Sequence, residues 1–178
     1  MKYTKKLLSY AKNVKLIATD VDGVLTSGEV ILLENNEEVK IWNVKDRLAI
    51  RLIKQYLPDI KIAWITGRKS KQVELRVKEL GVDFLVQECK DKKKEVIKIA
   101  NKMNIESSQI AYIGDDIIDL SVLNIAGVSV CPKDAVDEVK KIAKYISKYD
   151  GGKGVLRETI EIVLKANNLW QQIIKERL

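Results

Sequence analysis

Five short apolar runs recur along the chain, at residues 14–18, 60–65, 84–86, 110–113 and 128–130. Between them, apolar residues repeat mostly with helical spacing, as in Val73, Val77 and Leu80. Buried strands that alternate with amphipathic helices are typical of a parallel sheet covered on both faces. The pattern therefore predicts an α/β fold with a doubly wound, Rossmann-like parallel sheet, and a chain of 178 residues fits one domain spanning residues 1–178.

Polar or glycine-rich junctions follow three of the apolar runs. They are Asp20, Thr66-Gly67-Arg68 and Gly114-Asp115-Asp116. In open parallel sheets ligands bind at the carboxyl ends of the strands, so we expect these junctions to converge in space. The pattern thus places a candidate site at one edge of the sheet.

The segment between Gly28 and Asp46 interrupts the alternation of strands and helices. Two short extended runs flank Asn35-Asn36, a pair that tolerates left-handed backbone, which predicts a β-hairpin at about residues 28–45. Residues 30–33 are apolar on both faces of the expected strand, more than a solvated two-stranded flap requires. The hairpin is therefore expected either to pack on the domain or to join subunits.

The tail, at about residues 151–178, begins with Gly-Gly-Lys-Gly and continues with helical spacing. The glycine-rich sequence lacks the Ser or Thr and the earlier glycine of a phosphate-binding P-loop, so we interpret it as a flexible turn. From residue 155 the apolar positions form one helical stripe, suited to packing on the domain or on another subunit: Leu156, Ile160, Val163, Trp170 and Ile174.

The amino-acid composition excludes several kinds of catalytic and metal-binding site. The chain has no histidine, which excludes Ser-His-Asp triads and imidazole metal sites, and its two cysteines have no metal-binding or redox spacing. The net charge of +7 comes from lysines spread among glutamates, so a solvated surface is favoured over nucleic-acid binding. No membrane span and no signal peptide are apparent, and we expect a cytoplasmic protein.

Two acidic sequences could be simple turns or helix caps. In DVDGVLT, starting at Asp20, the glycine is fourth rather than sixth, which excludes an EF-hand loop. GDDIID, starting at Gly114, could merely cap a helix. Lys92 follows the expected N-cap Asp91 and begins a run of three lysines in a helical first turn, where cations are disfavoured unless they meet an anion. Together these features favour a site that binds phosphate.

In order, DVDGVLT, Thr66-Gly67-Arg68, Lys92 and GDDIID resemble the four motifs of the haloacid dehalogenase superfamily of phosphohydrolases. Further features resemble its 3-deoxy-D-manno-octulosonate 8-phosphate phosphatase branch: the hairpin, residues 43–46, TGRKSKQVELRVKELG from Thr66, and GGKGVLRE from Gly151. The resemblance covers nearly the whole chain. It implies a Mg²⁺-dependent phosphoric monoester hydrolase with a hairpin flap in place of a cap domain.

The resemblance also implies roles for single residues. Asp20 would be the nucleophile that forms an aspartyl-phosphate, and Asp22 the acid-base group. Mg²⁺ would bind the carboxylates of Asp20 and Asp115 and the backbone carbonyl of Asp22. The remaining candidates divide into residues that hold the phosphoryl oxygens, Thr66 and Lys92, those that orient the metal ligands, Asp116 and Asp119, and those that bind substrate, Gly67, Arg68, Arg76 and Arg157.

The branch resemblance implies a sugar-acid phosphate as substrate, a role in lipopolysaccharide biosynthesis, and a homotetramer in which hairpins form a central barrel. Where the family usually has Asp-Gly, one variable residue and Gly-Ile, this chain has Asp46-Arg47-Leu48-Ala49-Ile50. The added side chains leave open a nine-carbon sugar-acid phosphate or a broader set of phosphosugars. A non-catalytic assembly subunit on the same fold is a further alternative.

Overall fold

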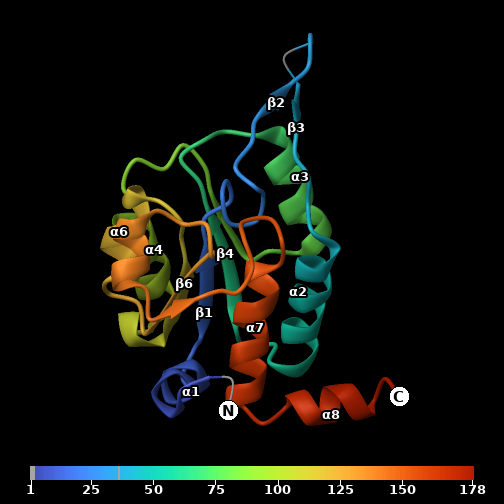
Figure 1. Ribbon diagram of the computed structural model, residues 1–178, viewed down its shortest axis with the longest axis vertical. Coiled ribbons are helices and arrows are strands. Elements are labelled where there is room, and N and C mark those ends of the chain that lie inside the picture. Colours follow the sequence, from blue (N-terminus) through green and yellow to red (C-terminus); the bar gives the residue numbers. More distant parts are fainter. Residues whose placement is uncertain (1–2, 36) are drawn as a thin grey trace.

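Six parallel strands form the central sheet of the protein, in the order β5-β4-β1-β6-β7-β8 (Figure 1). Residues 3–35 and 37–178 are described by the structure, a computed structural model. The strands are β1 (Leu16–Thr19), β4 (Lys61–Ile65), β5 (Phe84–Val86), β6 (Ile110–Ile113), β7 (Val128–Cys131) and β8 (Tyr145–Ile146). The five predicted strands are confirmed, whereas the short edge strand β8 was not predicted.

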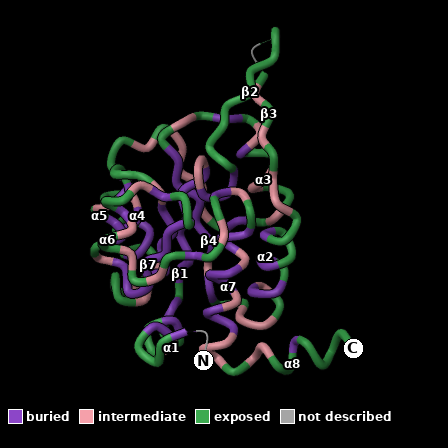
Figure 2. Tube along the Cα trace, viewed as in Figure 1, coloured by how far each residue is buried: buried purple, intermediate pink, exposed green. Residues whose placement is uncertain are grey.

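Helices cover both faces of this sheet, as expected for a doubly wound fold. The helices are α1 (Lys5–Lys12), α2 (Val44–Tyr56), α3 (Lys71–Leu80), α4 (Lys92–Lys102), α5 (Leu120–Leu123), α6 (Asp137–Ile142), α7 (Val155–Ala166) and α8 (Trp170–Lys175), with short 3-10 turns at Ser107–Gln109 and Ile117–Asp119. Successive residues of β1 point to opposite faces: Ile17 packs in the layer with α1, α2 and α7, and Leu16 and Ala18 in the layer with α4 and α5. Strands β1 and β7 are accordingly buried (Figure 2), as is β6, whereas the edge strands β5 and β8 are partly exposed.

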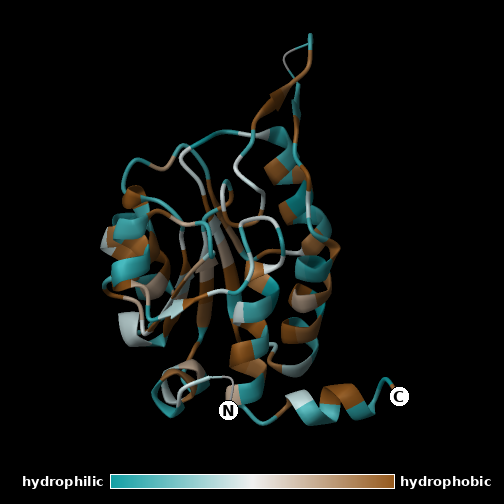
Figure 3. Ribbon diagram, in the orientation of Figure 1, coloured by the Kyte–Doolittle hydropathy of each residue, from teal (hydrophilic) through white to brown (hydrophobic). Residues whose placement is uncertain are grey.

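The predicted hairpin is present and projects from the carboxyl edge of the sheet (Figure 1). Strands β2 (Ile31–Leu32) and β3 (Glu38–Val39) pair antiparallel, and the Leu33 amide donates to the Glu37 carbonyl at 2.8 Å. Asn36 of the predicted turn lies outside the described residues. The apolar run is exposed, Leu32 by 66%, and is visible in Figure 3 as an apolar segment far from the core. The apolar run of the hairpin therefore does not pack on its own domain, so that alternative for the run is wrong.

The tail forms two helices rather than one continuous stripe. Helix α7 is buried against the core through Leu156, Ile160 and Val163. The chain then turns at Asn168, which has a φ of 61°, and α8 runs in a new direction with Ile174 41% exposed (Figure 1). The single stripe predicted over residues 155–174 is wrong because a left-handed residue interrupts it, and its first half is intramolecular.

The glycine-rich turn before α7 is closely packed, so the prediction of flexibility is wrong. The Gly152 amide donates to the Val24 carbonyl at 2.9 Å. A Cβ added at Gly151 would lie 2.1 Å from the Gly23 carbonyl oxygen. Only glycine at position 151 allows this approach of two backbones. The turn thus supports the loop that follows β1.

Asp46 joins α2 to the start of α7. Its side-chain Oδ1 accepts a hydrogen bond of 2.7 Å from the Arg157 amide in the first turn of α7. The side chain is buried, and this burial raises the pKa of Asp46 to about 6, against the favourable effect of the Arg157 amide and guanidinium. The ionised Asp46 carboxylate therefore lowers the free energy of unfolding at neutral pH.

We expect Asp46→Asn to stabilise the protein by about 1 to 3 kcal/mol at pH 7 and to have little effect below pH 4. A carboxyl group with a raised pKa adds stability while it is protonated, and that contribution is lost as the pH rises through about 6. Asparagine keeps an oxygen that can accept from Arg157 but has no charge. Urea unfolding from pH 4 to 8 measures the effect, with the exposed Asp59→Asn as control. A destabilised Asp46→Asn at pH 7 would contradict the prediction.

Candidate active site

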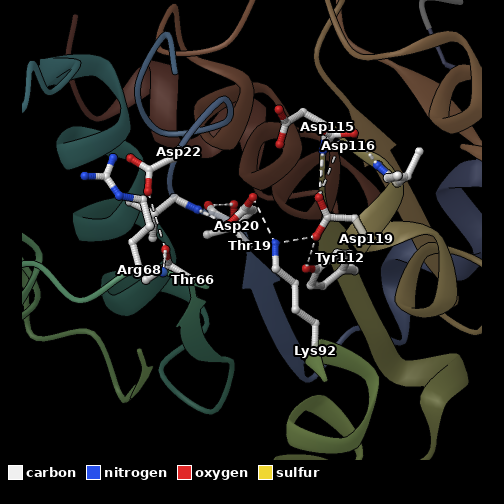
Figure 4. Close-up of polar contacts among 12 residues, drawn as sticks. Thr19, Asp20, Asp22, Thr66, Arg68, Lys92, Tyr112, Asp115, Asp116 and Asp119 are labelled. Atoms are coloured by element: carbon white, nitrogen blue, oxygen red, sulfur yellow. Dashed lines mark hydrogen bonds and ion pairs between the residues drawn. The ribbon is translucent and has the colours of Figure 1, made fainter. Parts of the chain in front are cut away.

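Asp20, the first residue after β1, lies in a buried network with Lys92 and Asp119 (Figure 4). Lys92 Nζ lies 2.9 Å from Asp20 Oδ2 and 2.8 Å from Asp119 Oδ1. The other oxygen of Asp20 accepts a hydrogen bond of 2.7 Å from the Val21 amide. Lys92 begins α4, whereas the next two lysines point to solvent. The polar residues that follow β1 and β6 therefore meet, as predicted.

Asp119 is fully buried, and both of its oxygens accept hydrogen bonds. Its Oδ1 accepts from Tyr112 Oη at 2.6 Å as well as from Lys92. Its Oδ2 accepts from the amides of Asp115 and Asp116, at 3.1 and 3.3 Å. Through these contacts Asp119 holds Lys92 and the loop after β6 in place. Tyr112 was missed because it lies inside an apolar run, although a buried tyrosine hydroxyl needs a partner.

Asp115 completes a cluster of oxygen ligands. One carboxylate oxygen from each of Asp20, Asp115 and Asp119 lies within 4.8 Å of the others. Asp115 Oδ1 is buried without a hydrogen-bond partner among the described residues. Gly23 has a φ of +87°, and a Cβ there would lie 2.1 Å from Asp115 Oδ2, so glycine lets the two loops meet.

The three carboxyl groups of this cluster have too little positive charge around them for all three to be ionised. Burial raises the pKa of Asp20 to about 6, with Lys92 opposing and Asp119 adding to the rise. Burial and then the charges of Asp20 and Asp119 raise the pKa of Asp115 to about 8. Lys92 alone does not compensate three carboxylates in this space. A divalent cation among them would.

Asp22 lies beside the cluster, on the side of the Thr66 turn (Figure 4). Thr66 Oγ1 is 3.4 Å from Asp22 Oδ2, and Lys40 of the hairpin forms an ion pair with Asp22 Oδ1. Arg68 Nη2 lies 3.3 Å from Glu38 Oε1, also on the hairpin. The turn at Gly67 and the base of the hairpin therefore meet above Asp22. Lys40 was missed because a single lysine in a polar strand has no distinguishing pattern.

Three other candidates face different partners. Asp116 is exposed and caps the Ile117 amide at 2.6 Å. Arg76 pairs with Glu79 at 2.6 Å and lies over the Trp42 ring, and Arg157 lies over the Trp170 ring. The structure does not bring the guanidinium groups of Arg76 and Arg157 into the carboxylate network, so their roles in substrate binding stay predictions.

Comparison with known proteins gives the family. The profile of the haloacid dehalogenase-like hydrolases matches residues 85–158. The 3-deoxy-D-manno-octulosonate 8-phosphate phosphatase of Escherichia coli K12 is 38% identical over 160 residues, which are 90% of this chain and 84% of that protein. The chain belongs to the 3-deoxy-D-manno-octulosonate 8-phosphate phosphatase family. The predicted superfamily and branch are confirmed.

Relatives of the 3-deoxy-D-manno-octulosonate 8-phosphate phosphatase family also share the whole fold. The Yersinia pestis enzyme is 35% identical over 162 residues, 91% of this chain and 86% of that protein. The crystal structure of the Moraxella catarrhalis enzyme, in complex with magnesium ion, phosphate ion and KDO, has a TM-score of 0.91 and 36% identity, covering 97% of this chain and 99% of that one. The protein is thus a phosphoric monoester hydrolase with the haloacid dehalogenase fold.

Proposed function

We propose that this protein is a Mg²⁺-dependent phosphatase that hydrolyses 3-deoxy-D-manno-octulosonate 8-phosphate through an aspartyl-phosphate, and that the whole chain acts as one domain. The observation that carries the proposal is the network of Asp20, Lys92, Asp115 and Asp119 at the carboxyl ends of adjacent strands in a chain of this family. The reaction would serve lipopolysaccharide biosynthesis, as the family resemblance implies.

The residues of the cluster fit Mg²⁺. The ion prefers carboxylate and carbonyl oxygens, and these are offered by the nearby Asp20 carboxylate and by Asp115 Oδ1, which has no hydrogen-bond partner in the described part of the chain. Asp119 is less suited to direct ligation because its oxygens already accept four hydrogen bonds. We therefore assign Asp20 and Asp115 as ligands, together with the backbone carbonyl of Asp22 that the family resemblance implies, with Asp119 and Asp116 supporting the loop. When bound, Mg²⁺ supplies charge that lets a carboxylate approach an anionic phosphate.

In the first step an oxygen of Asp20 attacks phosphorus, and the bond from phosphorus to the sugar oxygen breaks. Lys92, fixed between Asp20 and Asp119, and the Thr66 hydroxyl hold the phosphoryl oxygens, where charge spreads in the transition state. Protonated Asp22 gives its proton to the departing sugar oxygen. The products are the free sugar acid and phosphorylated Asp20.

In the second step a water molecule attacks the phosphorus of phosphorylated Asp20. Asp22, now a carboxylate, takes a proton from that water, and the bond between Asp20 and phosphorus breaks. Inorganic phosphate leaves, and Asp20 and Asp22 return to their starting states. The chain needs no histidine for this cycle, in agreement with its composition.

The departure at residues 46–50 affects the walls of the site less than the sequence implied. Arg47 pairs with Glu79 of α3, its Nε 3.3 Å from Glu79 Oε1. Ala49, on the inner face of α2, is fully buried in the core. Leu48 stands at the position that is variable in the family, and it is 43% exposed. We propose that the substrate remains a sugar-acid phosphate.

Phosphate release from a panel of phosphosugars, with and without Mg²⁺, tests the proposed function. We expect the largest kcat/KM for 3-deoxy-D-manno-octulosonate 8-phosphate. The panel includes a nine-carbon sugar-acid phosphate and simple hexose phosphates as comparisons. A larger kcat/KM for another member would contradict the substrate, and no release from any member would favour a non-catalytic assembly subunit.

We also propose that the protein assembles as a homotetramer through its hairpins. Four successive apolar residues, Val30 to Leu33, are between 43 and 66% exposed, which is unusual for a solvated flap. Burying them between copies would remove this apolar surface from water. Light scattering at low protein concentration measures the mass, and a monomer would contradict the proposal.

None of the helices in residues 3–35 and 37–178 is long and apolar enough to cross a bilayer.

A further inference from the structure

A buried lysine from the hairpin contacts the proposed acid-base residue. Lys40 follows β3, and its side chain is only 2% exposed. Its ammonium group forms ion pairs with Asp22 Oδ1 and, at 2.7 Å, with Glu38 Oε1. The other oxygen of Asp22 faces the Thr66 hydroxyl at 3.4 Å. Both oxygens of this carboxyl group therefore have a partner on a different segment.

Burial of the Lys40 ammonium group costs desolvation free energy, which its contacts must offset by stabilising the fold or by serving the reaction. Burying an ammonium group requires close anionic partners, and a lysine that simply supported the hairpin would be served by Glu38 alone. Glu38 already has a second cationic partner, Arg68 Nη2 at 3.3 Å. Lys40 thus extends a chain of charges from the turn after β4, through the hairpin, to Asp22.

Proton transfer in the first step depends on where the Asp22 carboxyl group points. A free aspartate side chain samples several rotamers, and each wrong orientation lowers the fraction of complexes ready to react. Contacts to both oxygens remove that freedom. Lys40 supplies one of these two contacts. Because Lys40 belongs to the hairpin, the position of the hairpin then affects the orientation of the Asp22 carboxyl group.

We propose that Lys40 is a positioning residue that fixes the orientation of the Asp22 carboxyl group, so that the hairpin controls protonation of the leaving group. The inference rests on the proposed phosphatase function. It predicts that Lys40 matters in proportion to how much the leaving group needs a proton. A sugar alkoxide needs one, whereas p-nitrophenolate leaves readily without it.

The test compares Lys40→Met with the native protein on two esters in excess Mg²⁺, 3-deoxy-D-manno-octulosonate 8-phosphate and p-nitrophenyl phosphate. The quantity measured is kcat/KM, which reports the step that expels the leaving group. We expect a loss of roughly 10 to 100-fold on the sugar ester, part of the 10² to 10⁴-fold that general acid catalysis provides, and less than about 3-fold on the aryl ester. Equal losses on both esters, or none, would overturn the inference.

Three further variants sharpen the test. Lys61→Met is the matched control, because Lys61 also pairs with an aspartate, Asp83, but lies at the opposite end of β4; it should change neither ester. Asp22→Asn should show the same selective loss, and adding Lys40→Met to it should cost nothing more on the sugar ester. An additive loss would contradict action through Asp22.

Lys40→Arg keeps the positive charge and covers the case in which Lys40→Met fails to fold, which thermal melting and light scattering detect. It should lose less than Lys40→Met, and the loss should again fall on the sugar ester. An unselective loss in Lys40→Arg would overturn the inference. If the native protein hydrolyses neither ester, the proposed function fails and the inference with it, whereas activity without selectivity contradicts the inference alone.

Discussion

Asp20→Asn is expected to lower kcat on the sugar-acid phosphate by at least about 10⁴-fold, to the limit of detection. An amide oxygen is a poor nucleophile and carries no charge for Mg²⁺, so both the attack on phosphorus and one metal ligand are lost together. Steady-state phosphate release measures the rate. Rapid quenching of the native protein in acid, followed by intact mass, should show one added phosphoryl group that the variant lacks.

The fold should survive this change. Asparagine has the size of aspartate and keeps one oxygen, which can accept from the Val21 amide, while Lys92 keeps its contact of 2.8 Å with Asp119 Oδ1. We expect a circular dichroism spectrum like that of the native protein, and the exposed Asp59→Asn serves as a control for handling. A folded Asp20→Asn protein with native activity would exclude the nucleophilic role of Asp20.

Removal of the metal is expected to have the next largest effect. Chelation with EDTA should reduce kcat/KM by at least about 100-fold, because charge neutralisation by a divalent ion contributes several kcal/mol to phosphoryl transfer. Excess Mg²⁺ should restore the rate. Calcium should not, because it takes more ligands at longer distances than the cluster of Asp20 and Asp115 is expected to supply.

The same titration should change stability without unfolding the protein. Mg²⁺ binds the folded state only, so a concentration one hundred times its Kd should add about 2.7 kcal/mol to the free energy of unfolding. Asp115→Asn, at the oxygen without a partner among the described residues, should weaken this stabilisation while Asp59→Asn leaves it unchanged. Full activity in EDTA would contradict the assigned metal site.

The sequence was sufficient to predict the sheet and the carboxylate site because both depend on local patterns. Apolar runs of strand length specify the strands, and the rule that ligands bind at their carboxyl ends brings Asp20, Thr66 and Asp115 together before any contact is known. Lys92 was identifiable because three lysines in a helical first turn conflict with the helix dipole. For Lys92, then, a departure from ordinary local preference marked the residue.

Residues whose importance comes from distant partners escaped this reasoning. Tyr112 is hidden in an apolar run, and its hydroxyl acquires a role only through Asp119. Lys40 is one of many lysines until the hairpin folds over Asp22. The single stripe predicted for the tail failed for the opposite reason, since helical spacing continues through Asn168 although the backbone there is left-handed. Periodicity records which side chains face one way, not whether the helix continues.

The contact of Gly151 and Gly152 with the loop after β1 bears on when the protein becomes active during its synthesis. A ribosome adding about 5 to 20 residues per second delivers Asp20 to Val24 well before Gly152. A nascent chain that stops at Asp119 already carries the proposed nucleophile, acid, lysine and metal ligands, but the nucleophile loop has no backing from Gly152. Phosphatase activity should therefore appear only once Gly151 and Gly152 have left the ribosome.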